Sequence, residues 1–501
     1  MTQKTFASLL DSLDSDQCRA ATCLQGPVRI TAVAGAGKTR TITTRIAYAC
    51  ETGAWNPKTT VAVTFSTKAA LEMRHRLQQL GITEVTSATF HSLAFSQLYR
   101  LWNELVGTEM PQLLENPLDL IYQAAKQVIH HDIAPYDAVS IAEEINWTKV
   151  NLISPDDYGK VCTVLKRPIP LGMTEKHMAC IIDAYEQIKL SHHQIDFQDV
   201  LLLLCHLLES SHEAAAMIQK TIQHLTIDEY QDISPLQHHL VQLWLGQHNK
   251  NICVVGDPAQ TIYSFTGATN WYLKNFNTEF SPLSADIYLA KDYRSSQNII
   301  NLANYILDQS PVSENYVHLI AASSSACAIP TIQTYRTDTL EADGVAHHIQ
   351  QLLHSGISPN EIAVLTRLNA QLHQFRRCFD QSDIPFTVRR DHADDGNKFF
   401  FSQAIRKRIQ DGTIGSLNTP TVTLSTIHAA KGMEWDHVFI CGVSDDMIPF
   451  HHGNMTSEEI EEERRLLYVA VTRGKQQVQL SYAQQKNNNS SGVRMLSRFL
   501  Q

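Results

Sequence analysis

A short turn rich in glycine and alanine, AVAGAGKT, carries the clearest chemical signal in the chain. Branched apolar residues at Val28–Val33 predict a buried strand before it, and Thr39–Ala49 predicts a helix after it. Small residues let consecutive backbone N–H groups curl around a phosphate chain at the positive end of that helix. In this interpretation Lys38 reaches the β- and γ-phosphates and the Thr39 hydroxyl holds Mg²⁺. The predicted nucleotide-contacting residues are Ala32, Val33, Ala34, Gly35, Ala36, Gly37, Lys38, Thr39 and Arg40.

An acidic pair, Asp228-Glu229, closes an apolar run in the sequence LTIDEYQD. At the end of a strand near a phosphate loop, Asp228 is predicted to bind Mg²⁺ together with Thr39. Glu229 is predicted to orient and deprotonate the attacking water. The chain between Lys38 and Asp228 is longer than a minimal nucleotide-binding fold needs, which predicts an insertion there.

Length and composition describe a globular chain of 501 residues, of which 43% are hydrophobic and 18% charged. Such a length predicts about three domains. No long apolar run and no signal-peptide pattern are found, so we expect a cytoplasmic protein. Ten scattered cysteines without a C-x-x-C pair argue against a zinc ribbon or an iron–sulfur cluster. The net charge of −10 excludes a generally basic, DNA-coating protein, so we expect any nucleic-acid contact in a groove that uses stacking.

Strands that alternate with helices predict an α/β fold with doubly wound parallel sheets, whose strand-end loops form the site. Residues 1–100 and 200–280 are expected to form a first lobe, and residues 101–199, interrupted by prolines, a helical insertion. Residues 281–390 and 421–501 are expected to form a second lobe, with a vestigial insertion at 391–420. The predicted strands are Thr60–Phe65, Val85–His91, Ile287–Leu289, Glu361–Thr366, Thr421–Thr426, His437–Val443 and Val478–Tyr482, and a charged helix is predicted at Glu458–Val471.

Hydroxyl and aromatic side chains at several predicted strand ends favour a track for a single nucleic-acid strand. Hydroxyls would contact phosphates and rings would stack on bases. The candidates are Thr64, Phe65, Thr89, His91, Tyr263 and Phe265. Packing at the sheet edge is the alternative for Phe65, and core packing is the alternative for Tyr263 and Phe265.

The second lobe has no phosphate loop of its own, which suggests one ATP completed by arginines from that lobe. Arg294 in KDYRS and Arg473 in VAVTRG are the candidates, and Gln260 could sense the γ-phosphate. The Gln17 amide offers the donor and acceptor that suit an adenine edge. An ordinary surface position is the alternative for Gln17 and for either arginine taken alone.

The motifs form one ordered series: LDSDQ, AVAGAGKT, AVTFSTKAALEM, TFHSLA, IDEYQD, VVGDPAQTIYSFTGA, DYRSSQNI, TIHAAKGMEWDHVFI and EEERRLLYVAVTRG. Over nearly the whole chain this series resembles the UvrD/Rep/PcrA family of superfamily 1 DNA helicases. The resemblance implies two RecA-like lobes, ATP and Mg²⁺ as cofactors, and 3′ to 5′ movement on single-stranded DNA. It also implies that Gln17 and Tyr293 contact adenine and that Glu434 contacts the ribose. The γ-phosphate contacts it implies are Gln260, Arg294 and Arg473.

The chain departs from the family pattern in three places. Val33 stands where glycine is usual, and Phe265 and Thr266 stand where tryptophan and arginine are usual. Segment 391–420 is too short for the family's large helical subdomain, although Phe399–Lys407 predicts one short helix. This compact form resembles the helicase-like subunit of Gabija-type antiphage systems, which works beside a nuclease. We expect a motor that unwinds poorly alone and has such a partner, in repair or in defence; the alternative is a nucleotide switch or DNA-end sensor.

Overall fold

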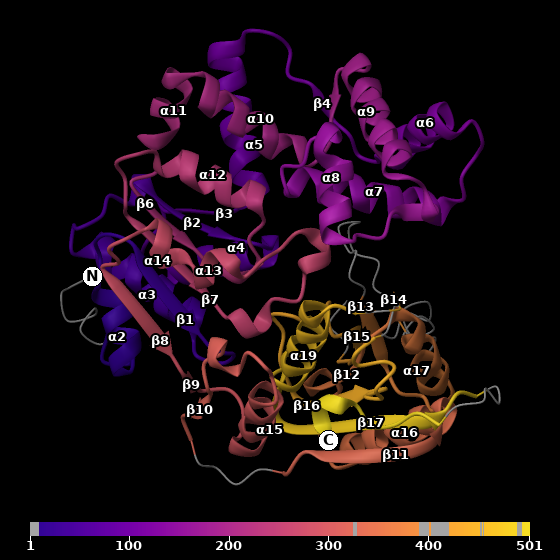
Figure 1. Cartoon of the computed structure of the whole chain (residues 1–501). Helices are drawn as coiled ribbons and strands as arrows, with labels where there is room; N and C mark the ends of the chain where they lie inside the picture. The colour runs from indigo at the N-terminus through magenta and orange to yellow at the C-terminus, as the bar shows by residue number, and fades with distance from the viewer. Residues whose placement is uncertain are drawn as a thin grey trace, which may run out of the picture. The chain divides into compact units, whose positions relative to one another are not determined.

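A computed structural model describes residues 10–323, 328–389, 400–401, 420–450, 453, 455–487 and 493–501 (Figure 1). The chain divides into two compact units. The first contains Met1–Thr31, Lys38–Gly256 and Tyr263–Tyr288. The second contains Ala32–Gly37, Asp257–Ile262 and Leu289–Gln501.

The first unit is built on a six-stranded sheet with the order β3-β2-β6-β7-β1-β8. Its strands are β1 (Val28–Ala32), β2 (Thr60–Thr64), β3 (Thr86–Thr89), β6 (His224–Ile227), β7 (Ile252–Gly256) and β8 (Ala285–Leu289). The β1–β7, β7–β6, β6–β2 and β2–β3 pairs are all parallel. Buried parallel strands read as nearly continuous apolar runs, as ICVVG does in β7.

Helices pack on this sheet and close its core. They are α2 (Ser15–Thr22), α3 (Lys38–Glu51), α4 (Thr67–Gln79), α5 (Phe90–Leu101), α10 (Asp199–Ser210), α11 (His212–Gln219), α12 (Pro235–Leu245), α13 (Trp271–Lys274) and α14 (Phe276–Glu279). Trp244 of α12 lies fully buried in this core. Its ring stacks on Phe90 with 5.8 Å between centroids, and its N–H donates to Gln97 Oε1 at 2.8 Å. The large ring therefore joins α12 to α5 while its one polar atom stays satisfied.

A helical segment lies between α5 and α10 in the sequence (Figure 1, purple). It contains α6 (Leu118–Ile129), α7 (Pro135–Val150), α8 (Pro155–Leu165) and α9 (Glu175–Ser191), with β4 (Gln112–Leu113) paired in parallel to β5 (Gln194–Ile195). Its own apolar core includes Ile141, Tyr158 and Ile181. Proline is tolerated at a first helical position because its missing N–H would have no helical partner there. Prolines therefore start α7 and α8 instead of breaking them.

The second unit contains a seven-stranded sheet with the order β11-β17-β16-β12-β15-β13-β14. Its elements are β11 (Thr331–Thr337), β12 (Ile362–Thr366), β13 (Phe386–Arg389), β14 (Phe400–Phe401), β15 (Val422–Thr426), β16 (Trp435–Cys441), β17 (Gly474–Gln485), α15 (Gln297–Asp308), α16 (Asp338–His354), α17 (Asn369–Gln381) and α19 (Ser457–Val471). All neighbouring strands pair in parallel except β13 and β14. The two sheets confirm the predicted α/β class with parallel strands.

The structure corrects two predicted strands. The strand expected at Ile287–Leu289 forms as β8, but it extends the first sheet beside β1 instead of belonging to the second sheet. The strand expected to reach His91 ends at Thr89, because Thr89 caps α5, which begins at Phe90. The structure also contains β11, an edge strand with the largely exposed sequence TIQTYRT, which the sequence pattern does not predict.

Most of segment 391–420 lies outside the described residues, so its vestigial insertion stays a prediction. Two of its residues form β14, antiparallel to β13. The helix predicted over Phe399–Lys407 is therefore wrong at Phe400 and Phe401. Among the described residues, no single helix is both long and apolar enough to cross a membrane, although α10 and α11, bent by 111°, match the length and composition jointly.

Candidate functional site

The phosphate-loop turn joins β1 to the first residue of α3. Gly35 and Gly37 have φ angles of +71° and +74°, in the left-handed region that glycine adopts without steric cost. The N–H of Ala36 donates to Val33 O at 3.3 Å and tightens the turn. Because the first N–H groups of a helix lack helical partners, the turn and α3 offer N–H donors and a positive dipole end to an anion.

Lys38, Thr39 and Arg40 form the first turn of α3. Arg40 is exposed and donates to the backbone oxygen of Ser12 at 2.9 Å, which fixes it near the start of α2. Gln17 is 3% exposed, and its Oε1 accepts from the N–H of Asp14 at 3.2 Å. Gln17 therefore has a capping role in α2, whatever it contributes to an adenine edge.

Asp228 and Glu229 follow β6 directly. Asp228 is 4% exposed, and its N–H donates to Val63 O at 2.9 Å, continuing the pairing of β6 with β2. Its Oδ1 accepts from the N–H of Glu229 at 2.9 Å. Glu229 has a φ of +54°, a conformation that side-chain-bearing residues rarely adopt, and Gln231 Nε2 donates to Glu229 Oε2 at 2.6 Å. The turn after β6 thus fixes both carboxylates.

The charge environment of Asp228 links it to the phosphate loop. Burial raises the pKa of Asp228 to about 7, and the charge of Glu229 adds to that shift. The ammonium of Lys38 acts in the opposite direction and lowers this pKa, so Lys38 lies within electrostatic reach of Asp228. A buried carboxylate with a raised pKa gains from a divalent cation, which favours its ionised form. The hydroxyl of Thr39 and the carboxylate of Asp228 therefore fit Mg²⁺ by charge and ligand type.

In the second unit, the loop after β9 (Lys291–Asp292) contacts the phosphate-loop turn. The N–H of Tyr293 donates to Gly35 O at 3.0 Å. Asp292 Oδ1 accepts from the N–H groups of Arg294 at 2.6 Å and Ser295 at 3.1 Å. A Cβ placed on Gly35 would lie 1.8 Å from Asp292 Oδ1, so only glycine fits this approach. The structure thus brings Tyr293, whose ring is half exposed, beside the turn.

Arg294 and Glu434 lie together in the second unit. Arg294 Nε is 2.6 Å from Glu434 Oε2, and Lys475 Nζ is 3.1 Å from Glu434 Oε1. Burial raises the pKa of Glu434, but the two cations outweigh burial and lower it. Arg294, one of the three residues that the resemblance assigns to the γ-phosphate, therefore forms an ion pair with Glu434, which it assigns to the ribose.

Arg473 and Gln260 are both buried in the second unit. The Arg473 guanidinium donates to Val469 O at 2.9 Å and to Met433 O at 3.1 Å. Gln260 Nε2 donates to Asp257 Oδ2 at 2.7 Å, which orients its amide. Within this unit, Arg473 therefore donates hydrogen bonds to backbone carbonyls, and Gln260 donates one to a carboxylate.

The predicted DNA residues at the ends of β2 and β3 differ in exposure. Thr64 is buried, and its hydroxyl donates to Ser66 O at 3.1 Å. Phe65 is half-buried, packs against the core and meets Phe90 edge to face at 5.4 Å. Thr89 Oγ1 accepts from the N–H of Ser92 as the cap of α5. Phe65 therefore takes part in the sheet-edge packing that was the alternative for this ring.

The structure adds one aromatic residue that the sequence pattern does not single out. Phe197, in the turn between β5 and α10, is 52% exposed and stacks on His91 with 3.8 Å between centroids. His91 Nε2 lies 3.2 Å from Gln198 Oε1. The sequence IDFQD, in which an aromatic residue lies between two acidic residues at the start of a helix, could have pointed to Phe197. It was missed because it lies inside the segment predicted to be a helical insertion.

Tyr263 and Phe265 form a second aromatic pair. Their rings meet edge to face at 6.1 Å, and Phe265 is 56% exposed. Thr266 donates its hydroxyl to Tyr263 O at 2.8 Å, which stabilises the turn that carries both rings. Phe265 is thus exposed, unlike the half-buried Phe65.

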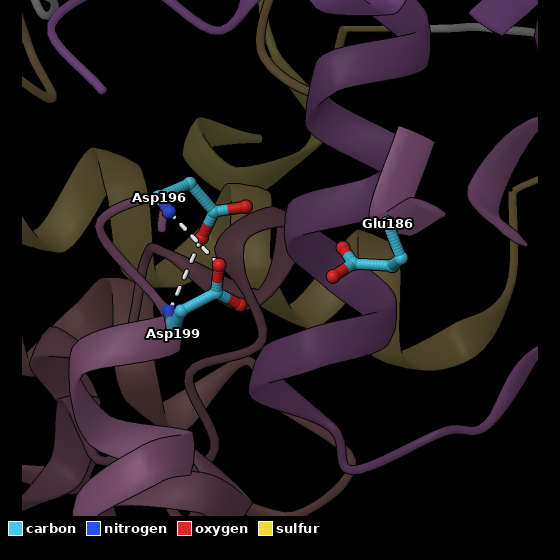
Figure 2. A group of neighbouring side chains, drawn as sticks. All are labelled: Glu186, Asp196 and Asp199. Carbon is cyan, nitrogen blue, oxygen red and sulfur yellow. Dashed lines mark hydrogen bonds between the residues drawn. The ribbon is translucent and has the colours of Figure 1, made fainter. Parts of the chain in front are cut away.

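A third group of carboxylates lies where the helical segment joins α10 (Figure 2). Glu186, Asp196 and Asp199 each offer an oxygen within 4.8 Å of the others, a spacing that could hold a metal ion. Lys149 Nζ, however, lies 2.5 Å from Asp196, 2.6 Å from Asp199 and 2.8 Å from Glu186. An ammonium therefore occupies the position that a cation would take.

Comparison with known proteins covers both units. The profile of the UvrD/REP helicase N-terminal domain matches residues 13–281, and that of the UvrD-like helicase C-terminal domain matches residues 287–410 and 404–485. ATP-dependent DNA helicase UvrD2 of Mycobacterium tuberculosis is 31% identical over 98% of this chain and 81% of its own length. ATP-dependent DNA helicase PcrA of Staphylococcus epidermidis is 30% identical over 81% of this chain and 53% of its own length. The phosphate loop, the acidic pair after β6 and these matches together identify the chain as a member of the UvrD/REP family of DNA helicases.

Proposed function

We propose that this chain is an ATPase stimulated by single-stranded DNA, along which it moves from 3′ to 5′. The observation that carries the proposal is the acidic pair directly after β6, in which Asp228 is buried, Gln231 holds the Glu229 carboxylate, and the charge of Lys38 lowers the pKa of Asp228. A lysine, a hydroxyl and a carboxylate at the ends of parallel strands are the groups that bind a Mg²⁺–triphosphate.

In this mechanism the turn and α3 bind the phosphates through N–H donors, and Lys38 balances their charge. Thr39 and Asp228 would hold Mg²⁺, which would supply positive charge against the charge that develops on the transferred phosphoryl group. Glu229 accepts the proton of the attacking water, and Gln231 orients its carboxylate through the 2.6 Å hydrogen bond. The exposed rings of Phe265 and Phe197 stack on bases of the bound strand.

We infer further that the chain unwinds duplex DNA weakly by itself, in the cytoplasm, and acts beside a partner such as a nuclease in repair or antiphage defence. The alignment with UvrD2 spans 582 residues, so that relative carries residues inside the matched region that this chain of 501 residues lacks. Segment 391–420 is short for a subdomain that grips a duplex. The compact form resembles the helicase-like subunit of Gabija-type systems.

A DNA-end sensor that gates a partner enzyme is the second candidate. Thr266 stands where the family usually has arginine, and its hydroxyl is used inside its own turn. A sensor would bind and hydrolyse ATP in response to DNA, without sustained movement along the strand.

One set of assays tests these proposals. ATP hydrolysis is measured with and without single-stranded DNA, next to duplex unwinding and displacement of streptavidin from biotinylated strand ends. We expect stimulated hydrolysis, displacement from the 5′ end and weak unwinding. Hydrolysis that responds to DNA without displacement from either end would reject the motor and leave the sensor. Hydrolysis indifferent to DNA would reject both.

A further inference from the structure

The turn that carries Phe197 is bound to a pair of buried carboxylates. The N–H of Asp196 donates to Asp199 Oδ2 at 2.8 Å, and the N–H of Asp199 donates back to Asp196 Oδ1 at 3.1 Å (Figure 2, dashed lines). The N–H of Gln198 also donates to Asp196 Oδ1, at 3.0 Å. Three backbone N–H groups next to Phe197 are thus held by these two side chains, which fix the backbone of the turn that carries its ring.

The carboxylates are in turn held by two lysines of the helical segment. Lys149 comes from α7 and Lys189 from α9, and both contact Asp196 and Asp199. The residues Lys149 and Lys189 are 8% and 1% exposed. The hydroxyl of Tyr185 adds a hydrogen bond to Asp196 Oδ2 at 3.0 Å. We call Lys149, Lys189, Asp196 and Asp199 the buried ion cluster.

The charges of the cluster depend on one another. Burial alone would lower the pKa of Lys149, but the carboxylates of Asp196, Asp199 and Glu186 outweigh it and raise that pKa. Burial would raise the pKa of Asp196, but Lys149 and Lys189 outweigh it and lower that pKa. Removing one lysine would leave Asp196 and Asp199 to share the remaining lysine, and buried carboxylates with too little positive charge relax by moving or by taking up water or protons.

Phe197 and Gln198, between the two carboxylates, both touch His91 of the first lobe. His91 lies in the first turn of α5, whereas the lysines belong to the helical segment. The cluster is therefore the connection through which the helical segment reaches the exposed Phe197–His91 stack.

We propose that Lys149 and Lys189 are positioning residues, which hold the Asp196–Asp199 turn so that Phe197 stacks on His91 and presents its face to a DNA base. This inference rests on the proposed function, because it assigns Phe197 a contact with single-stranded DNA. The lysines act through Phe197 and do not touch the strand. The lysines therefore contribute to DNA affinity by orienting Phe197 and not by attracting the phosphates of the strand.

The test is a double-mutant cycle on the affinity for a fluorescent oligo-dT, measured without nucleotide by anisotropy. Phe197→Ala should weaken binding about tenfold, the scale of one lost base stack. Lys189→Met should weaken it several-fold, because the ring is no longer fixed. In the double variant Lys189→Met should add nothing to Phe197→Ala, since the ring through which it acts is gone.

Two matched controls separate positioning from general loss of structure. Lys189→Met combined with Phe265→Ala should be additive, because Phe265 lies on a different turn. Lys160→Met, at an exposed lysine of α8, should leave affinity unchanged. If Lys189→Met does not fold, Asp199→Asn removes one cluster charge at nearly constant shape and should show the same non-additivity with Phe197→Ala.

Additive effects of Lys189→Met and Phe197→Ala, or equal coupling to Phe265, would overturn the inference. Phe197→Ala with parental affinity would overturn it as well. ATP hydrolysis with and without DNA is measured on the same samples and tests the proposed function separately from the inference about the lysines. A salt dependence of binding that Lys189→Met does not change would support positioning, since no phosphate contact is lost.

Discussion

At the scale of residues, Glu229 combines a catalytic assignment with an unfavourable backbone. Its φ of +54° belongs to a region that costs a non-glycine residue about 1–3 kcal/mol. The turn retains this conformation because Asp228 Oδ1 accepts the Glu229 N–H and Gln231 holds its carboxylate. The strain is therefore located at the residue that we propose orients the attacking water.

Lys38 and Glu229 should affect hydrolysis in different ways. Lys38→Ala removes a phosphate contact, so nucleotide binding and turnover should both fall. Glu229→Gln keeps the shape but removes the base, so ATP should still bind while turnover falls by ~10²-fold or more. Binding of a fluorescent ATP analogue and steady-state hydrolysis measure the two effects. Normal turnover in Glu229→Gln would contradict the assignment of the base.

Gly35 and Gly53 allow two effects of a glycine-to-alanine substitution to be compared: a steric clash with a neighbouring side chain, and backbone strain alone. Both have positive φ, +71° and +72°, but a Cβ at Gly35 would meet Asp292 whereas a Cβ at Gly53 has no atom within 4 Å. Gly53→Ala should cost about 1 kcal/mol of stability and keep hydrolysis. Gly35→Ala should abolish hydrolysis. Thermal denaturation and ATPase rates measure both; equal activities would show that the approach of Asp292 is unimportant.

At the scale of elements, Arg294 and Arg473 have different partners in the second unit: Arg294 pairs with a carboxylate, whereas Arg473 donates to backbone carbonyls. Arg294→Ala and Arg473→Ala should each lower turnover, with about 10³-fold as the guide from arginine fingers, and change ATP affinity less. Arg473→Ala should also lower the melting temperature, because its guanidinium serves the carbonyls of Val469 and Met433. Arg336→Ala, at an exposed position of β11, is the control. Unchanged turnover in both variants would contradict the γ-phosphate assignment.

The elements that the sequence predicted well are those with one dominant signal. β2 and β12 are buried on both faces, so their apolar runs identify them. β11 was not predicted because an exposed edge strand needs no apolar pattern. β8 was assigned to the wrong sheet because its pairing with β1 depends on tertiary structure, which the local sequence does not show. The buried ion cluster was equally hidden, since Lys149 and Asp196 look like ordinary surface charges until their helices pack.

At the scale of the whole molecule, acid should destabilise the fold partly through His428. Burial first, and then Arg367 and Lys431, lower its pKa from 6.5 to about 3. The unfolded chain therefore takes up this proton first, so the stability is complete above pH 6.5, declines as pH falls from 6.5 to about 3, and levels off below. We expect His428→Asn to flatten the pH dependence of the unfolding free energy by up to about 1.4 kcal/mol per pH unit. Urea denaturation between pH 4 and 7 measures it, with exposed His212→Asn as control; an unchanged slope would contradict the expectation.

The pairing of β13 with β15 has a consequence for how such helicases diversify. Phe386 to Arg389 align in parallel with Val422 to Ser425, so these two strands pair directly, and the chain between them adds only the short β14 beside β13. The length of that chain is therefore uncoupled from the strand register, because neither strand needs it to pair. A module of another size can be grafted at this junction without rebuilding the ATP-binding elements.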